Sequence, residues 1–254
     1  MRMAVEAKLA ILFGVGVLTG FINILAGGGS LITLPVLIFL GLPGTVANGS
    51  NRVAILIQNL VAVASFRQLN IFPWRVSLVA VGPALFGVLI GANLAVHIPD
   101  HLFKQILAAI MIGVMLIIWL DPAHRFKLKP GPLQGRRLLL FAVAFFAIGI
   151  YGGFIQAGAG FIIISVLLLA GFDLVQTNAI KVLVVFIFTL LALAIFILHG
   201  QVNYLYGVFL GLGSATGAFI ATRVAVKKGH QWIKGFVVAM VFIFAAKLFM
   251  DTLK

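Results

Sequence analysis

Three consecutive glycines and a serine, Gly27, Gly28, Gly29 and Ser30, stand directly before an apolar stretch that begins at Leu31. If that stretch is a helix, the run lies at its N-terminus, where backbone N–H groups lack intrahelical partners and the helix dipole is positive. Glycine also lacks the Cβ atom that would keep a ligand away from the backbone. The run is therefore a candidate anion-binding site.

A similar element occurs in the second half of the chain, where Gln156, Gly158 and Gly160 come before an apolar stretch that begins at Phe161. It would point a second helix N-terminus at the same depth of the structure. The alternative for both elements is that the glycines only allow broken helices to pack closely. We favour a ligand site, because close packing alone does not require a break in the helix.

Each of these apolar stretches is followed by a cluster of polar residues that ends in a cation, Arg52 in the first half and Lys181 in the second. Either cation could neutralise a bound oxyanion, or it could extend to the lipid headgroups and anchor a helix end. The neighbouring amides and hydroxyls are costly to bury without partners. The candidate ligands in the two clusters are Asn48, Ser50, Asn51, Arg52, Thr177, Asn178 and Lys181.

Amide side chains are rare inside the apolar segments. Asn23 lies one helical turn before the glycine run, and Gln58 and Asn59 lie along the third apolar segment. Such residues either form hydrogen bonds between helices or contact a substrate. We include Asn23 among the candidate ligands and leave both interpretations open for Gln58 and Asn59.

The elements that must position these residues are long and apolar. The chain has 254 residues, of which 63% are hydrophobic and 9% are charged, and its mean hydropathy is +1.24. These values predict an all-α polytopic membrane protein. The net charge of +13 lies mostly in loops, where Lys and Arg orient the chain in the lipid bilayer, so we expect no nucleic-acid partner. We expect neither a metal nor a cofactor, and the absence of cysteine excludes thiolate sites.

The apolar segments fall into two sets that predict an internal duplication. Gly28, Gly41, Asn48, Gly87 and Lys104 recur at a constant separation as Gly158, Gly171, Asn178, Gly217 and Lys234. We therefore expect a first transmembrane repeat at 1–120, a basic loop between the repeats at 121–137 and a second transmembrane repeat at 138–254. The segments lie at 9–26, 30–42, 53–66, 76–96, 103–120, 138–156, 160–172, 182–198, 203–222 and 233–250.

The second segment of each half is short, about 20 Å as a helix, and does not comfortably cross a hydrocarbon core of about 30 Å. If the first two segments form a hairpin that returns to its starting side, the three later spans invert the second half relative to the first. If they form one broken span, the halves are parallel. We favour inverted repeats, each with a broken or re-entrant hairpin plus three spanning helices, because only they place all three most basic loops on the cytoplasmic side. Those loops lie at 67–75, 121–137 and 223–234.

These residues carry a family resemblance. The stretch GFINILAGGGSLITLPVLIFLGLPGTVANGSNRV, from Gly20 to Val53, resembles the first repeat of the TauE/SafE sulfite-exporter-like permeases, the TSUP family. The stretch GGFIQAGAGFIIISVLLLAGFDLVQTNAIKV, from Gly152 to Val182, resembles a degenerate second copy. The resemblance implies export or uptake of small anions, such as sulfite, sulfonates or other organosulfur compounds, across a prokaryotic inner membrane. The sequence departs from the family pattern in its short first glycine run and in the alternating Ala157 to Gly160.

We therefore predict a permease that takes a small anion by alternating access at a midplane site between two broken helices. A passive anion channel is the alternative, because it would use the same residues. Enzyme activity is not expected, since the histidines are scattered and no HExxH or Gly-x-Ser-x-Gly motif occurs. The five acidic residues fall at predicted loops or ends, which argues against a carboxylate proton relay. A homodimer is possible through pairs of small residues four apart.

Overall fold

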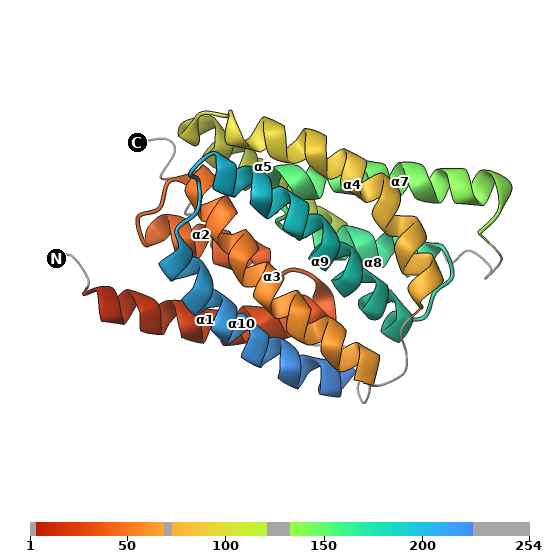
Figure 1. Cartoon of the computed structure of the whole chain (residues 1–254), viewed down its shortest axis with the longest axis horizontal. Coiled ribbons are helices and arrows are strands. Elements are labelled where there is room, and N and C mark those ends of the chain that lie inside the picture. The colour runs from red at the N-terminus through yellow and green to blue at the C-terminus, as the bar shows by residue number, and fades with distance from the viewer. Residues whose placement is uncertain (1–3, 69–72, 121–132, 226–254) are drawn as a thin grey trace.

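The computed structural model describes residues 4–68, 73–120 and 133–225. Within those ranges the regular structure is entirely helical (Figure 1), which confirms the predicted fold class. The helices are α1 (Val5–Ala26), α2 (Ser30–Phe39), α3 (Gly44–Gln68), α4 (Trp74–Val96), α5 (Asp100–Leu120), α7 (Gly135–Ile155), α8 (Ala159–Leu169), α9 (Leu174–Leu198) and α10 (Tyr204–Ala225).

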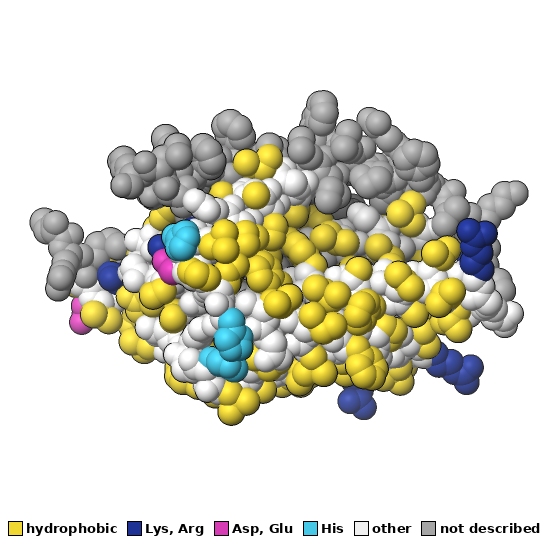
Figure 2. Space-filling view, turned by 90° about the horizontal axis from the view of Figure 1, so that it is seen from above, with side chains coloured by type: hydrophobic (Ala, Val, Ile, Leu, Met, Phe, Trp, Pro, Cys, Tyr) yellow, Lys and Arg dark blue, Asp and Glu magenta, His cyan; other side chains and the backbone are white. Residues whose placement is uncertain are grey.

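Five of the described helices, α1, α4, α7, α9 and α10, are long and apolar enough to cross a membrane. Helix α2 has 10 residues and α8 has 11, which corresponds to roughly 15 Å, about half of a hydrocarbon core. Figure 2 shows hydrophobic side chains over the middle of one face of the molecule and Lys and Arg side chains toward its ends. This distribution fits an apolar belt in lipid with charged ends in water.

Both predicted helix breaks are present. Helix α1 ends at Ala26, Gly27 adopts a left-handed conformation with φ of 84°, and α2 begins at Ser30. Helix α7 ends at Ile155, Gln156 has φ of 32°, and α8 begins at Ala159. A positive φ is easy for glycine and unusual for other residues, so Gln156 is held by its surroundings. The chain therefore reverses at two places where it exposes a helix C-terminus and a helix N-terminus together.

The third and eighth segments begin earlier than the hydropathy pattern predicts. Helix α3 starts at Gly44 rather than at 53, and α9 starts at Leu174 rather than at 182. The additional turns contain the two polar clusters, which lower the local hydropathy although the side chains are buried. The predicted boundaries were wrong because buried polar residues and loop residues look alike in a hydropathy profile.

The two halves interlock rather than forming separate bodies. Helix α1 packs on α10, and α4 packs on α7, so the first helix of each half lies against the fourth helix of the other. Glycines permit both close approaches, because a Cβ atom at Gly20 would overlap Ser214 of α10, and one at Gly91 would overlap Ile150 of α7. These small-residue faces are used within the chain. A homodimer stays a prediction and would need a different face.

Helices α3 and α9, which correspond in the predicted duplication, run in opposite directions. In Figure 1, α3 runs from the upper left to the lower right, whereas α9 runs from the lower right to the upper left. This arrangement is the one that the inverted alternative requires. The repeat boundaries and the membrane side of each loop stay predictions, because the predicted last segment, 233–250, and most of the loop 121–137 lie outside the described residues.

Candidate functional site

The two helix breaks meet each other near the centre of the structure. A Cβ atom added at Gly27 would overlap the backbone of Gly160, and one added at Gly160 would overlap the backbone of Gly27. The two backbone segments can therefore touch only because both positions are glycine. The contact brings the N-terminus of α2 and the N-terminus of α8 to one place, as the sequence predicts.

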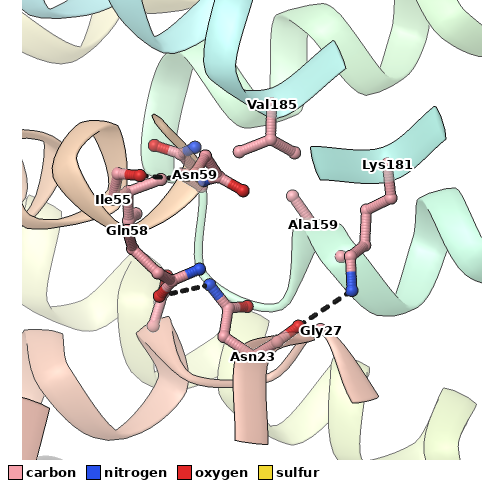
Figure 3. Close-up of a pocket in the computed structure, with 11 residues that line it drawn as sticks. Asn23, Gly27, Ile55, Gln58, Asn59, Ala159, Lys181 and Val185 are labelled. Atoms are coloured by element: carbon pink, nitrogen blue, oxygen red, sulfur yellow. Dashed lines mark hydrogen bonds between the residues drawn. The ribbon is translucent and has the colours of Figure 1, made fainter. Parts of the chain in front are cut away.

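A small cavity of about 20 Å³ lies at this junction (Figure 3). Side chains of α3 and α9 close it on the sides that the breaks leave open. Such a volume holds about one water molecule. The cavity is lined by Asn23, Gly27, Ser30, Ile55, Gln58, Asn59, Gln156, Ala159, Gly160, Lys181 and Val185.

Lys181 is the cation of this cavity. Its Nζ atom donates hydrogen bonds to the carbonyl oxygens of Asn23 and Ile24 and to Oδ1 of Asn178, each at 2.8 Å. Three donated bonds are the full capacity of an ammonium group. The two carbonyls belong to the last turn of α1. Lys181, in the second half of the chain, therefore binds the C-terminal end of a first-half helix, where the helix dipole is negative.

The other polar side chains around the cavity are amides and the hydroxyl of Ser30. The Nδ2 of Asn23 donates to Oε1 of Gln58 at 3.1 Å, and the Nε2 of Gln58 is buried without a partner among the described residues. The Nδ2 of Asn59 donates to the carbonyl oxygen of Ile55 at 2.8 Å. Gln156 donates to the hydroxyl of Thr189 at 2.8 Å. The cavity wall thus contains an unpaired donor beside a cation.

Arg52 lies outside the cavity lining, although it is fully buried. Its guanidinium donates to the carbonyl oxygens of Gly152 and Gly153 and to Oε1 of Gln156, and it lies 4.7 Å from the ring centroid of Phe196. The alternative in which Arg52 extends to lipid headgroups is therefore wrong. Arg52 instead donates hydrogen bonds to the carbonyl groups in the last turn of α7, and Lys181 does the same for the last turn of α1.

All four carbonyl groups at the C-terminal end of α7 have hydrogen-bond donors. The last four carbonyl groups of a helix have no intrahelical partner. In α7 those of Gly152 and Gly153 bind Arg52, that of Phe154 accepts from Nδ2 of Asn48 at 2.8 Å, and that of Ile155 accepts from the N–H of Ala157. The polar cluster of α3 is therefore what allows α7 to end inside the structure.

The other predicted ligands lie around the cavity rather than in its wall. Ser50 accepts from the N–H of Asn203 at 2.8 Å, and Oδ1 of Asn51 accepts from Thr33 at 2.7 Å. The hydroxyl of Thr177 is buried without a partner among the described residues. Of the predicted set, the residues outside the lining are Gly28, Gly29, Asn48, Ser50, Asn51, Arg52, Gly158, Thr177 and Asn178.

Several residues of the cavity wall were not in the predicted set. Gln58 and Asn59 were left open between two interpretations, and both line the cavity. Ile55, Ala159 and Val185 are apolar and carry no chemical signal of their own. Helical spacing could have indicated two of them, because Ile55 lies one turn from Gln58, and Val185 lies one turn from Lys181.

The acidic residues in the described ranges form no ion pair with these buried cations. Asp173 is exposed and caps α9 by accepting from the N–H groups of Val175 and Gln176 at 2.9 Å. Asp100 accepts from the N–H of Gly44 and pairs with Lys104 at 2.7 Å. In the described part of the chain, Arg52 and Lys181 have no carboxylate partner. The centre of the structure therefore favours negative charge.

Replacing Arg52 by alanine is expected to destabilise the fold more than it changes the cavity. A buried acceptor that loses its donor costs about 1–3 kcal/mol, and here three acceptors would lose theirs. We expect a large loss of thermal stability in detergent, measured by the unfolding of the purified protein. The exposed Arg75→Ala variant is the control and should unfold like the parent protein. Equal stability of both variants would contradict this structural role.

Comparisons with known proteins agree with the architecture described above. The family described as "Sulfite exporter TauE/SafE" matches residues 12–248. A "Probable membrane transporter protein" of Haemophilus influenzae is 32% identical over 96% of this chain and 95% of its own length. "Probable membrane transporter protein ORF9" of Sinorhizobium sp and "Probable membrane transporter protein YfcA" of Escherichia coli K12 are each 29% identical over 96% of this chain, and over 93% and 90% of their own lengths.

The family match covers the two breaks, the two polar clusters and the helices that surround the cavity. The relatives are named as probable membrane transporters, and the described part of the chain contains five helices suited to cross a membrane. The protein is a multi-pass integral membrane protein and a membrane transporter of this type. The chain belongs to the sulfite exporter TauE/SafE family.

Proposed function

We propose that the protein is a permease for small anions, with sulfite, sulfonates or related organosulfur anions as its substrate class, and that the anion binds at the junction of the two helix breaks. One observation carries the proposal. Two helix N-termini and the ammonium of Lys181 meet at a single buried cavity, and no carboxylate in the described ranges neutralises them.

The donors at this junction suit an oxyanion. The N–H group of Ser30, which lines the cavity, donates no backbone hydrogen bond within the described chain, and neither do those of Gly28 and Gly29, which lie outside the lining. Lys181 adds a compact positive charge, and the unpaired Nε2 of Gln58 adds a neutral donor. Backbone amides, an ammonium and a side-chain amide are the groups that bind sulfonate or carboxylate oxygens elsewhere.

The cavity volume of about 20 Å³ is smaller than an oxyanion with four heavy atoms, so binding requires the junction to widen. Lys181 must then exchange at least one of its acceptors for the anion, because all three of its N–H groups are occupied. Two of the three acceptors are carbonyls of α1, and giving up either of them would loosen the α1–α2 break from α9. Substrate binding is thereby coupled to movement of one hairpin, which alternating access needs.

Transport by reconstituted protein tests the proposal. Uptake into proteoliposomes is measured for sulfite, sulfate, thiosulfate, sulfoacetate and short carboxylates. We expect one anion group to show saturable flux and mutual competition. Flux that rises in proportion to concentration without saturation would support the alternative, a passive anion channel. Absence of flux for all anions, with a folded protein, would contradict the proposed function.

A further inference from the structure

We infer that the site selects a singly charged anion that carries its own hydrogen-bond donor, an O–H or N–H group, over an anion that can only accept. This inference rests on the proposed function and names its substrate class more closely. It follows from the acceptor atoms in the cavity wall, which an anion made only of acceptor oxygens would leave unpaired.

Asn59 provides the first acceptor. Its side chain is 1% exposed and lines the cavity. Its Nδ2 donates to the carbonyl oxygen of Ile55 at 2.8 Å, and a carbonyl can only accept. That bond fixes which end of the amide is nitrogen, so the Oδ1 atom is left as an acceptor. Within the described ranges the bond to Ile55 is the one side-chain hydrogen bond of Asn59, so Oδ1 is left open to the cavity.

The pair formed by Asn23 and Gln58 provides a second acceptor. The two amides share one hydrogen bond of 3.1 Å, and the Nε2 of Gln58, whose side chain is 3% exposed, has no partner among the described residues. If oxygen and nitrogen were exchanged in both amides, the hydrogen bond between them would remain, and one amide donor and one carbonyl acceptor would still be unpaired. In either assignment the pair presents one amide donor and one carbonyl acceptor to its surroundings.

For negative oxygens the wall therefore provides Lys181, the amide donor of the Asn23–Gln58 pair, the helix N-termini and the hydroxyl of Ser30, which can donate or accept. Its two amide carbonyl oxygens can only accept and need a donor from the ligand. A buried acceptor that loses water and gains no donor costs about 1–3 kcal/mol. A dianion without hydrogen atoms would incur that cost at both carbonyls and would add repulsion. A monoanion with one O–H or N–H group recovers at least one of the two bonds.

The test compares two anions that differ by a single hydroxyl group, ethanesulfonate and 2-hydroxyethanesulfonate. Their affinities are measured on the purified full chain by competition against the anion that it transports best. We expect the hydroxylated anion to bind about tenfold more tightly, since an unpaired buried acceptor is avoided. In Asn59→Leu the hydroxylated anion should lose its advantage, and the difference between the two anions should fall to less than about twofold.

Asn93→Leu is the matched control. Asn93 makes the same kind of bond to the carbonyl oxygen four residues earlier, Nδ2 to Leu89 at 2.7 Å, but it is exposed on α4. This variant should keep the full difference between the two anions. Equal affinities in the parent protein, or a difference that Asn59→Leu leaves unchanged, would overturn the inference. If neither anion competes while other anions are transported, sulfonates are not substrates. If nothing binds, the proposed function itself fails.

Discussion

Replacing Lys181 by methionine should abolish transport. Methionine keeps the length and apolar stem of the side chain and removes the ammonium, which is the cation in the wall of the cavity. Loss of one partner from a buried hydrogen-bonded charge pair costs about 2–5 kcal/mol, so we expect anion affinity and uptake to fall by roughly 100-fold. Uptake into proteoliposomes and anion binding by the purified protein measure the two effects separately.

Lys104→Met is the control for this change. Lys104 pairs with Asp100 on α5 at 2.7 Å and does not line the cavity, so its loss removes a positive charge without touching the site. Lys181→Arg should retain part of the affinity, because it keeps the charge but replaces a compact ammonium by a planar fork. Parent-like uptake by Lys181→Met would show that this cation only holds the end of α1.

The second large effect is expected from Gly160→Ala. A Cβ atom at this position would overlap the backbone of Gly27, which cannot move aside as a flexible side chain could. The added Cβ would lie 2.5 Å from the backbone of Gly27, so the two helix breaks must move apart to reach ordinary van der Waals contact, and the donors around the cavity are displaced. We expect uptake to fall at least about tenfold, since small displacements of positioned groups have effects of this size. Uptake per correctly folded molecule is the quantity to measure.

Gly14→Ala controls for the general effect of placing alanine in a helix. Gly14 lies in α1 and a Cβ atom there would meet no atom within 4 Å. Alanine favours an exposed helix interior over glycine by about 1 kcal/mol, so this variant should be at least as stable as the parent protein and fully active. If Gly160→Ala behaves in the same way, the contact between the breaks is not required for transport.

The sequence could predict the two helix breaks because their signal is local. A polar and glycine-rich interruption in an apolar stretch has few solutions inside lipid, where freed backbone groups must find partners. The breaks at Gly27 and Gln156 lie where the glycine patterns place them. The same local reasoning failed at the starts of α3 and α9, since a buried polar turn and a solvated loop have similar composition.

The partners of the two cations could not be predicted from the sequence. Arg52 contacts Gly152 and Gly153, a hundred residues further along the chain, and Lys181 contacts Asn23 and Ile24 in the other half. Their similar positions after the short helices suggested a shared role as ligands. The structure gives them a shared role as partners of helix ends, but only Lys181 also reaches the cavity. Long-range packing decides this difference, and spacing does not contain it.

Reciprocal bonding between the halves has a consequence for movement. In each broken hairpin, the carbonyl groups at the C-terminal end of the first helix accept hydrogen bonds from a cation of the opposite half. The cation is Arg52 for α7 and Lys181 for α1. The two terminal nitrogens of Arg52 donate to three acceptors, its Nε is buried without a partner among the described residues, and the side chain lies outside the cavity lining, whereas Lys181 lines the cavity. An anion bound in the cavity, as we propose, would therefore meet Lys181 before Arg52. We expect the α1–α2 hairpin to move first when substrate binds.

Selenite, a heavier analogue of sulfite, offers the most direct test of the central claim that an anion binds where the two helix breaks meet. Crystals of the full chain grown with selenite would locate selenium by its anomalous scattering. The account predicts a peak between the start of α2, the start of α8 and Nζ of Lys181. A selenium peak confined to the basic loops, in protein whose sulfite uptake selenite inhibits, would contradict it.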